Sequence, residues 1–116
     1  MPGLLAVPSL LDLHAAIRSV AESITSSPED MDPPLMNLGE KATAAARYWN
    51  YQHDSGRYTV ELETVQAWTA LVNMIDEFFG TLMEPVEDHT QHVLKVLRSL
   101  KAMQDQARAM LLAGMV

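Results

Sequence analysis

Four stretches of this sequence repeat apolar residues at alternating steps of three and four positions. We call each such stripe a seam. The first three seams are Leu10, Leu13, Ile17, Val20 and Ile24; Leu35, Leu38, Ala42, Ala45 and Trp49; and Val65, Trp68, Val72, Ile75, Phe79 and Leu82. The fourth is broader and contains Val93, Val96, Leu97, Leu100, Met103, Ala107, Met110 and Leu111. These steps place apolar side chains on one face of an α-helix, and that face must pack against other helices. The pattern predicts an all-α fold.

Start and stop signals bound these helices. Ser9 and Asp32 are suitable N-caps, Pro85 suits a first helical turn, and Gly114 suits a helix end. The predicted helices span residues 9–26, 33–54, 59–83 and 85–113. Short connections favour antiparallel neighbours, so we expect a four-helix up-down bundle that forms a single domain of residues 1–116.

Composition excludes several classes of protein. The 116 residues are 48% hydrophobic and 20% charged, which is typical of a globular domain rather than a disordered chain. No apolar run reaches the roughly 18 residues of a membrane-spanning helix. The absence of cysteine excludes disulfides, thiolate nucleophiles and sulfur ligands for metals. We therefore expect a cytoplasmic protein with no membrane contact.

The net charge of −7 is unevenly distributed along the chain. Residues 1–93 carry a net charge of −10, whereas residues 94–116 carry +3. Because phosphate backbones repel an acidic surface, direct nucleic-acid binding is not expected. One alternative function follows from the same charge: an acidic inhibitor that competes for the basic groove of a nucleic-acid-processing protein.

Two patterns that suggest metal binding are incomplete. His89 and His92 lie three positions apart, but a di-metal bundle needs Glu-x-x-His on two helices, and Val86 replaces the required glutamate. Glu84 and Glu87 match the first acidic pair of all-α nucleotide pyrophosphohydrolases, but no Glu-x-x-Asp pair follows them. We therefore expect neither a metal nor an organic cofactor.

Five residues separate Arg47 from His53. This spacing resembles the Arg-x4–6-His motif of HEPN domains, a family of small helical-bundle ribonucleases. The resemblance implies that the arginine holds a scissile phosphate and that the histidine moves a proton. Tyr48 departs from the polar residue that usually follows the arginine in that family. A HEPN-like ribonuclease is therefore kept as an alternative, and we do not expect an enzyme.

The stretch from Ala46 to Glu61 holds all three tyrosines and one of the two tryptophans. Residues 48–62 could form a β-hairpin, but the second seam continues in phase into Trp49, which favours two helices that meet near Ser55 and Gly56. That arrangement buries Trp49 and leaves the tyrosines near the turn, where aromatic and arginine side chains commonly bind partners.

The last seven residues, 110–116, are all non-polar. They cannot all face one bundle core, so some must be exposed or cover another surface. The predicted partner-binding residues are Arg47, Tyr48, Tyr51, Arg57, Tyr58, Met110, Leu111 and Met115. We expect a non-enzymatic protein–protein interaction module, a small acidic helical adaptor, chaperone or inhibitor that forms a homodimer.

Overall fold

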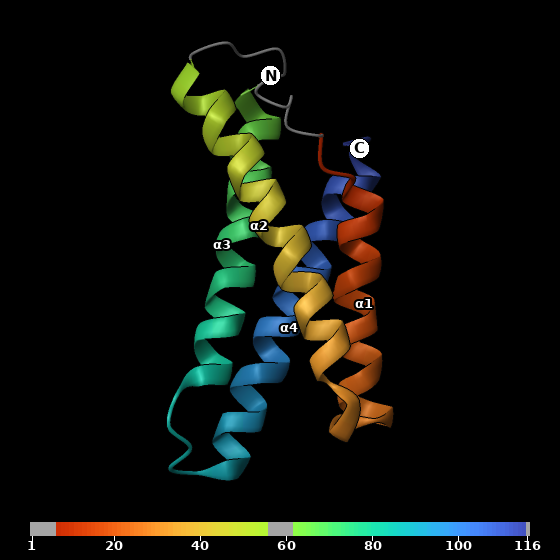
Figure 1. Cartoon of the computed structure of the whole chain (residues 1–116), viewed down its shortest axis with the longest axis vertical. Helices are drawn as coiled ribbons and strands as arrows, with labels where there is room; N and C mark the ends of the chain where they lie inside the picture. Colours follow the sequence, from red (N-terminus) through yellow and green to blue (C-terminus); the bar gives the residue numbers. More distant parts are fainter. Residues whose placement is uncertain (1–6, 56–61, 116) are drawn as a thin grey trace.

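The computed structural model contains four α-helices and one short 3-10 turn (Figure 1). The elements are α1 (Leu10–Ser26), η1 (Pro28–Asp30), α2 (Asp32–Ser55), α3 (Leu62–Met83) and α4 (His89–Leu112). The structure describes residues 7–55 and 62–115, except for the side chains of residues 52–55. Successive helices run in opposite directions, and α4 packs against both α3 and α1. The predicted all-α four-helix bundle is confirmed.

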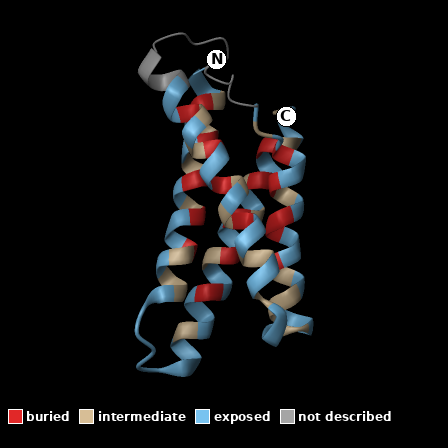
Figure 2. Ribbon diagram, in the orientation of Figure 1, coloured by how far each residue is buried: buried red, intermediate tan, exposed pale blue. Residues whose placement is uncertain are grey.

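The core is built mainly from the predicted seams. Not every predicted seam residue is buried: Phe79 is only half-buried, while its neighbour Phe78 is fully buried, and Leu97 is 39% exposed. The buried seam residues are Leu10, Leu13, Ile17 and Val20 in α1; Leu38, Ala42, Ala45 and Trp49 in α2; Val65, Trp68, Val72 and Ile75 in α3; and Val96, Leu100, Met103, Ala107 and Met110 in α4. They belong to one continuous cluster between the four helices (Figure 2). No polar or charged side chain is buried among the described residues, so burial of apolar surface is the main force that holds the helices together.

Two tryptophans join α2 to α3. The rings of Trp49 and Trp68 stack with centroids 5.6 Å apart and planes 26° apart. Tyr48 meets Trp49 edge-on at 5.0 Å. Neither indole N–H has a hydrogen-bond partner among the described atoms. The rings thus contribute through their apolar area and their stacking.

The ends of α1 and α4 carry specific caps. The Ser9 hydroxyl accepts a hydrogen bond of 3.2 Å from the amide of Asp12, as the sequence predicts for an N-cap. At the other end of the chain, Gly114 has a positive φ of 80° and donates to the carbonyl of Leu111 at 3.0 Å, while the Met115 amide donates to a carbonyl five residues back. These two hydrogen bonds form a Schellman motif, so the predicted stop at Gly114 is confirmed.

The predicted start of the fourth helix is wrong by four residues. Pro85 lies before the helix, and α4 begins at His89 with Asp88 as its N-cap. The Asp88 carboxylate accepts a hydrogen bond of 3.2 Å from the amide of Gln91. A helix starting at Pro85 would have needed Glu84 as its cap, and the short side chain of aspartate caps a helix better than glutamate does.

The other predicted boundaries differ little from the structure, although Asp32, predicted as an N-cap, is the first residue of α2. Residues 48–55 belong to α2 and Leu62 begins α3, so the described part of the alternative hairpin is helical. Predicted helical residues 59–61 lie outside the described residues. None of the helices in ranges 7–55 and 62–115 combines the length and apolar content of a membrane span.

The bundle has two ends, which we name for what they carry. The terminal end holds the start of α1, the end of α2, the start of α3 and the end of α4 (Figure 1). The turn end holds the two connections at residues 27–31 and 84–88. The tyrosines of α2 therefore lie at the terminal end.

Removing the stacked indole should destabilise the bundle. Trp49→Ala is expected to lower the free energy of unfolding by about 3 kcal/mol or more, because it deletes a buried ring and leaves a cavity. Urea unfolding followed by far-UV circular dichroism measures this change. The control is Tyr51→Ala, which lies on the exposed side of the same helix and should change stability by less than about 0.5 kcal/mol. If Tyr51→Ala lowered the free energy of unfolding more than Trp49→Ala does, the seam of α2 would have been assigned to the wrong face.

The observed cap of α4 can be tested in the same way. Asp88→Ala should lower the free energy of unfolding by about 1 kcal/mol, because the amide of Gln91 loses its acceptor. Glu87→Ala is the matched control, because Glu87 lies one residue earlier and does not cap the helix. It should lower the free energy of unfolding much less. Equal losses in the two variants would contradict the assignment of Asp88 as the N-cap.

Candidate protein-binding site

The last described turns of α2 present the predicted aromatic patch. Arg47 is exposed, Tyr48 is half-buried against the core, and Tyr51 is 59% exposed. Trp49, between them in sequence, is only 5% exposed. The predicted division between a structural tryptophan and an accessible tyrosine is therefore observed in the structure.

Helical geometry explains this division. Each residue advances about 100° around the axis, so Tyr48 and Tyr51 are near neighbours while Trp49 turns inward from both. The seam fixes that rotation, because Ala42, Ala45 and Trp49 all face the core. The helix thus holds Tyr51 outward on a rigid backbone.

Two predicted members of the patch lie beyond what the structure describes. Arg57 and Tyr58 belong to residues 56–61, outside the described residues. The side chain of His53 also lies outside them, so its geometry relative to Arg47 is untested and the HEPN-like ribonuclease remains a hypothesis.

The described residues of the C-terminal tail are divided between the core and the surface. Met110 is 2% exposed and belongs to the core, so it does not lie on the surface where the sequence analysis placed it. Leu111 and Met115 are half-buried against the same core. The Schellman turn directs Met115 back toward the bundle.

Sequence reasoning missed a residue in this tail. Leu112 is 80% exposed, although it directly follows two residues that pack inward. The seam could have identified it, because Ala107 and Met110 define the inward face and position 112 lies about 200° from position 110.

The terminal end also exposes apolar residues from the other helices. The large apolar residues exposed there are Val7 at 65%, Leu11 at 62%, Tyr51 at 59%, Leu62 at 59% and Leu112 at 80%. The described residues nearest this end carry charges of both signs, including Asp12, Arg47, Glu63 and Arg108. An apolar surface with balanced charge is suited to contact with another protein surface.

The two histidines that the sequence analysis considered as metal ligands lie at the turn end. His89 is exposed and His92 is half-buried at the start of α4. Within ranges 7–55 and 62–115, no three histidine, aspartate or glutamate side chains are grouped in a way that could hold a metal ion.

Comparison with known proteins identifies no similar family, protein or structure. No protein-family model matches the chain, and searches of curated proteins and of solved structures give no match.

Proposed function

We propose that this chain is a non-enzymatic protein-interaction module, a small acidic helical bundle that acts as an adaptor, chaperone or inhibitor. The observation that carries this proposal is Tyr51, which is 59% exposed at the terminal end beside half-buried Tyr48 and exposed Arg47. Tyrosine and arginine offer large contact areas with polar ends and are enriched among residues that dominate binding energy.

The patch is preorganised for binding. Tyr48 packs edge-on against Trp49, which in turn stacks on Trp68 in the core. A side chain that is already packed against the core, as Tyr48 is, loses less conformational entropy when a partner covers it. These contacts support a role for Tyr48 and Tyr51 in the binding of a protein.

A second copy of the chain is the proposed partner at this end. The exposed apolar residues of the terminal end come from all four helices, and the local charges are mixed in sign. Two such surfaces can therefore meet without strong repulsion, and two-fold pairing would cover the surplus apolar area. The resulting homodimer would be cytoplasmic and would not require a cofactor.

Weakening of the dimer by one substitution tests this proposal. Tyr51→Ala should weaken self-association by on the order of 2 kcal/mol, or roughly thirtyfold in dissociation constant, because it removes a central contact. Sedimentation equilibrium at micromolar concentration measures the change. Met83→Ala is the matched control, since Met83 is 84% exposed but lies at the turn end, and its dissociation constant should equal that of the wild type.

Two results would contradict the proposed pairing. A single species of 12.9 kDa throughout the micromolar range would show that the chain is a monomer. Equal weakening by Tyr51→Ala and Met83→Ala would show that the terminal end is not the interface.

A further inference from the structure

All four seams lose their burial at the turn end. Their outermost residues are Ile24 in α1, Leu35 in α2, Leu82 in α3 and Val93 in α4. The first three are half-buried and Val93 is 38% exposed, whereas the buried seam residues elsewhere are at most 8% exposed. No residue within 21–37 or 79–95 is buried (Figure 2). The bundle thus ends in one layer of core-type side chains that its own helices cover only in part. We call these four residues the open layer.

The arrangement of the helices accounts for the open layer. The hairpin of α1 and α2 and the hairpin of α3 and α4 diverge toward the turn end (Figure 1). Phe79 of α3 still reaches α2, where its ring lies 3.8 Å from the position of a Cβ on Gly39. Beyond that level, Leu35 and Leu82 are only half-buried.

Further apolar side chains surround the open layer. Large exposed residues of this end are Met36 at 67%, Met83 at 84%, Val86 at 55%, Leu94 at 38% and Leu97 at 39%. Methionine side chains are flexible and polarizable, so they adapt to the shape of a partner. The turn end therefore presents exposed apolar side chains that the apolar face of another element can cover.

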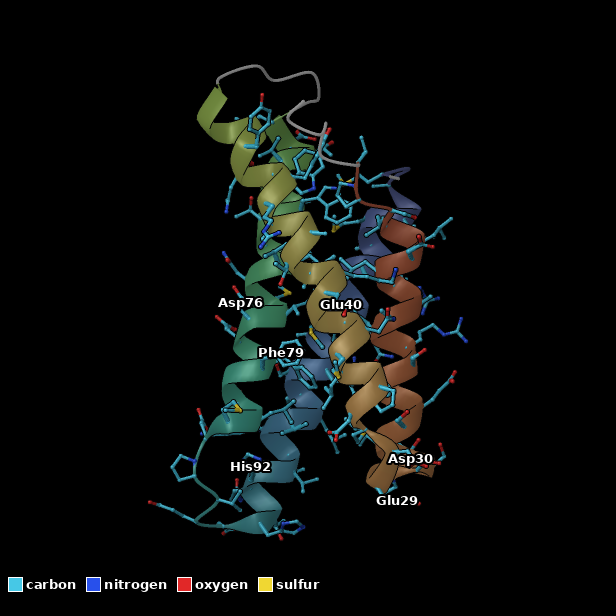
Figure 3. All side chains as sticks on the ribbon, viewed as in Figure 1. Glu29, Asp30, Glu40, Asp76, Phe79 and His92 are labelled. Carbon is cyan, nitrogen blue, oxygen red and sulfur yellow. The ribbon has the colours of Figure 1, made fainter. Side chains whose placement is uncertain are left out.

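The negative charge of the turn end indicates what kind of partner element could cover its apolar side chains. Residues 22–37 and 79–95 carry seven carboxylates and one cation, Lys95, a net charge of −6, whereas the whole chain carries −7. Glu22, at the edge of the first range, is paired with Arg18 at 3.8 Å. Lys95 is itself engaged by Glu84 at 3.5 Å. Glu29 and Asp30 lie at the α1–α2 connection (Figure 3). Glu87 belongs to the α3–α4 connection. Nearly the whole net charge of the protein therefore lies in the two segments that form the turn end.

One hollow at this end is suited to a cationic side chain. It has a volume of about 330 Å³ and lies against the α3–α4 connection. Its lining includes the carboxylates of Glu84, Glu87 and Asp88, together with His92. A lysine or arginine of a partner would find three carboxylates there and a single competing cation, Lys95.

We propose that the turn end binds a basic amphipathic helix of another protein. The apolar face of that helix covers the open layer, and its lysines and arginines meet the surrounding carboxylates. A second copy of this chain is disfavoured as the occupant, because it would bring two ends of net charge −6 together. This site is separate from the proposed dimer surface at the terminal end.

A pair of synthetic peptides tests the proposal on the full chain. The probe is a labelled helical peptide of about 18 residues, or roughly five turns, with leucine along one face and lysine on the other. Its acidic twin has glutamate in place of every lysine, and a third peptide has the composition of the probe with the leucines shuffled around the helix. Fluorescence anisotropy should show binding of the lysine probe alone, with an affinity that falls as salt concentration rises. Amide shifts of the isotopically labelled protein should change within residues 21–37 and 79–97.

Matched variants separate this surface from others. Leu97→Asp and Met83→Asp should each raise the dissociation constant of the lysine probe roughly tenfold or more. Leu112→Asp, on the same helix as Leu97 but at the terminal end, should leave it unchanged. The double variant Glu29→Lys, Glu87→Lys should also weaken binding roughly tenfold, whereas Glu63→Lys should have little effect. Met83 is 84% exposed, so Met83→Asp keeps the test valid if Leu97→Asp fails to fold.

Several outcomes would overturn the proposal. Equal binding of the acidic twin would show that the charge is not recognised, and equal binding of the shuffled peptide would show that the apolar face is not recognised. Equal weakening by Leu112→Asp, or amide shifts confined to the terminal end, would place the site elsewhere. A dimer that Leu97→Asp dissociates would show that a second copy occupies the turn end. Tyr51→Ala should leave probe binding unchanged, so failure of the proposed dimer would not be mistaken for failure of this site.

Discussion

Burial of one apolar seam per helix is the constraint on which the rest of this structure depends. The ion pairs of the described residues lie on the surface, as in Lys101 with Asp105 at 3.1 Å, and pairs of this kind contribute at most about 1 kcal/mol each. No described polar side chain is buried, and the chain has no cysteine. The position and rotation of each helix therefore follow from its seam. The stack of Trp49 on Trp68 is the clearest case, because it fixes which face of α2 turns outward.

The same constraint makes the two ends of the bundle different. At the terminal end the seams remain buried up to Leu10, Trp49, Val65 and Met110. At the turn end the seams continue, but their residues are only partly buried against the core. Seven carboxylates and one lysine lie there in residues 22–37 and 79–95. Closing the two hairpins there would bring those like charges nearer together, which would oppose the gain from covering the open layer. A partner with the opposite charge would reduce this repulsion and cover the apolar side chains at the same time.

Much of the fold could be predicted from the sequence, because seams with steps of three and four specify both helix type and helix rotation. That rotation also predicted that Trp49 is buried and that Tyr51 is accessible. The start of α4 was not predicted, since Pro85 and Asp88 are competing start signals whose balance depends on local hydrogen bonds. The seams also gave no indication of the open layer, because periodicity does not reveal where neighbouring helices diverge. Counting charge along the chain divides it into an acidic part, residues 1–93, and a basic part, residues 94–116. In the fold, residues 22–37 and 79–95 come together to form the acidic turn end, which that count did not reveal.

The two proposed surfaces have a joint consequence. A homodimer formed through terminal ends leaves both turn ends free, because the two surfaces lie at opposite ends of a bundle whose longest dimension is 46 Å. Each dimer would then offer two acidic, apolar sites separated by up to twice that length. A partner with a single basic helix would occupy the sites independently. A partner that carries two such helices on a linker able to span them would bind more tightly, because its second contact is intramolecular. Pairing at one end would thus make the proposed site at the other end selective for basic partners that are repeated or dimeric.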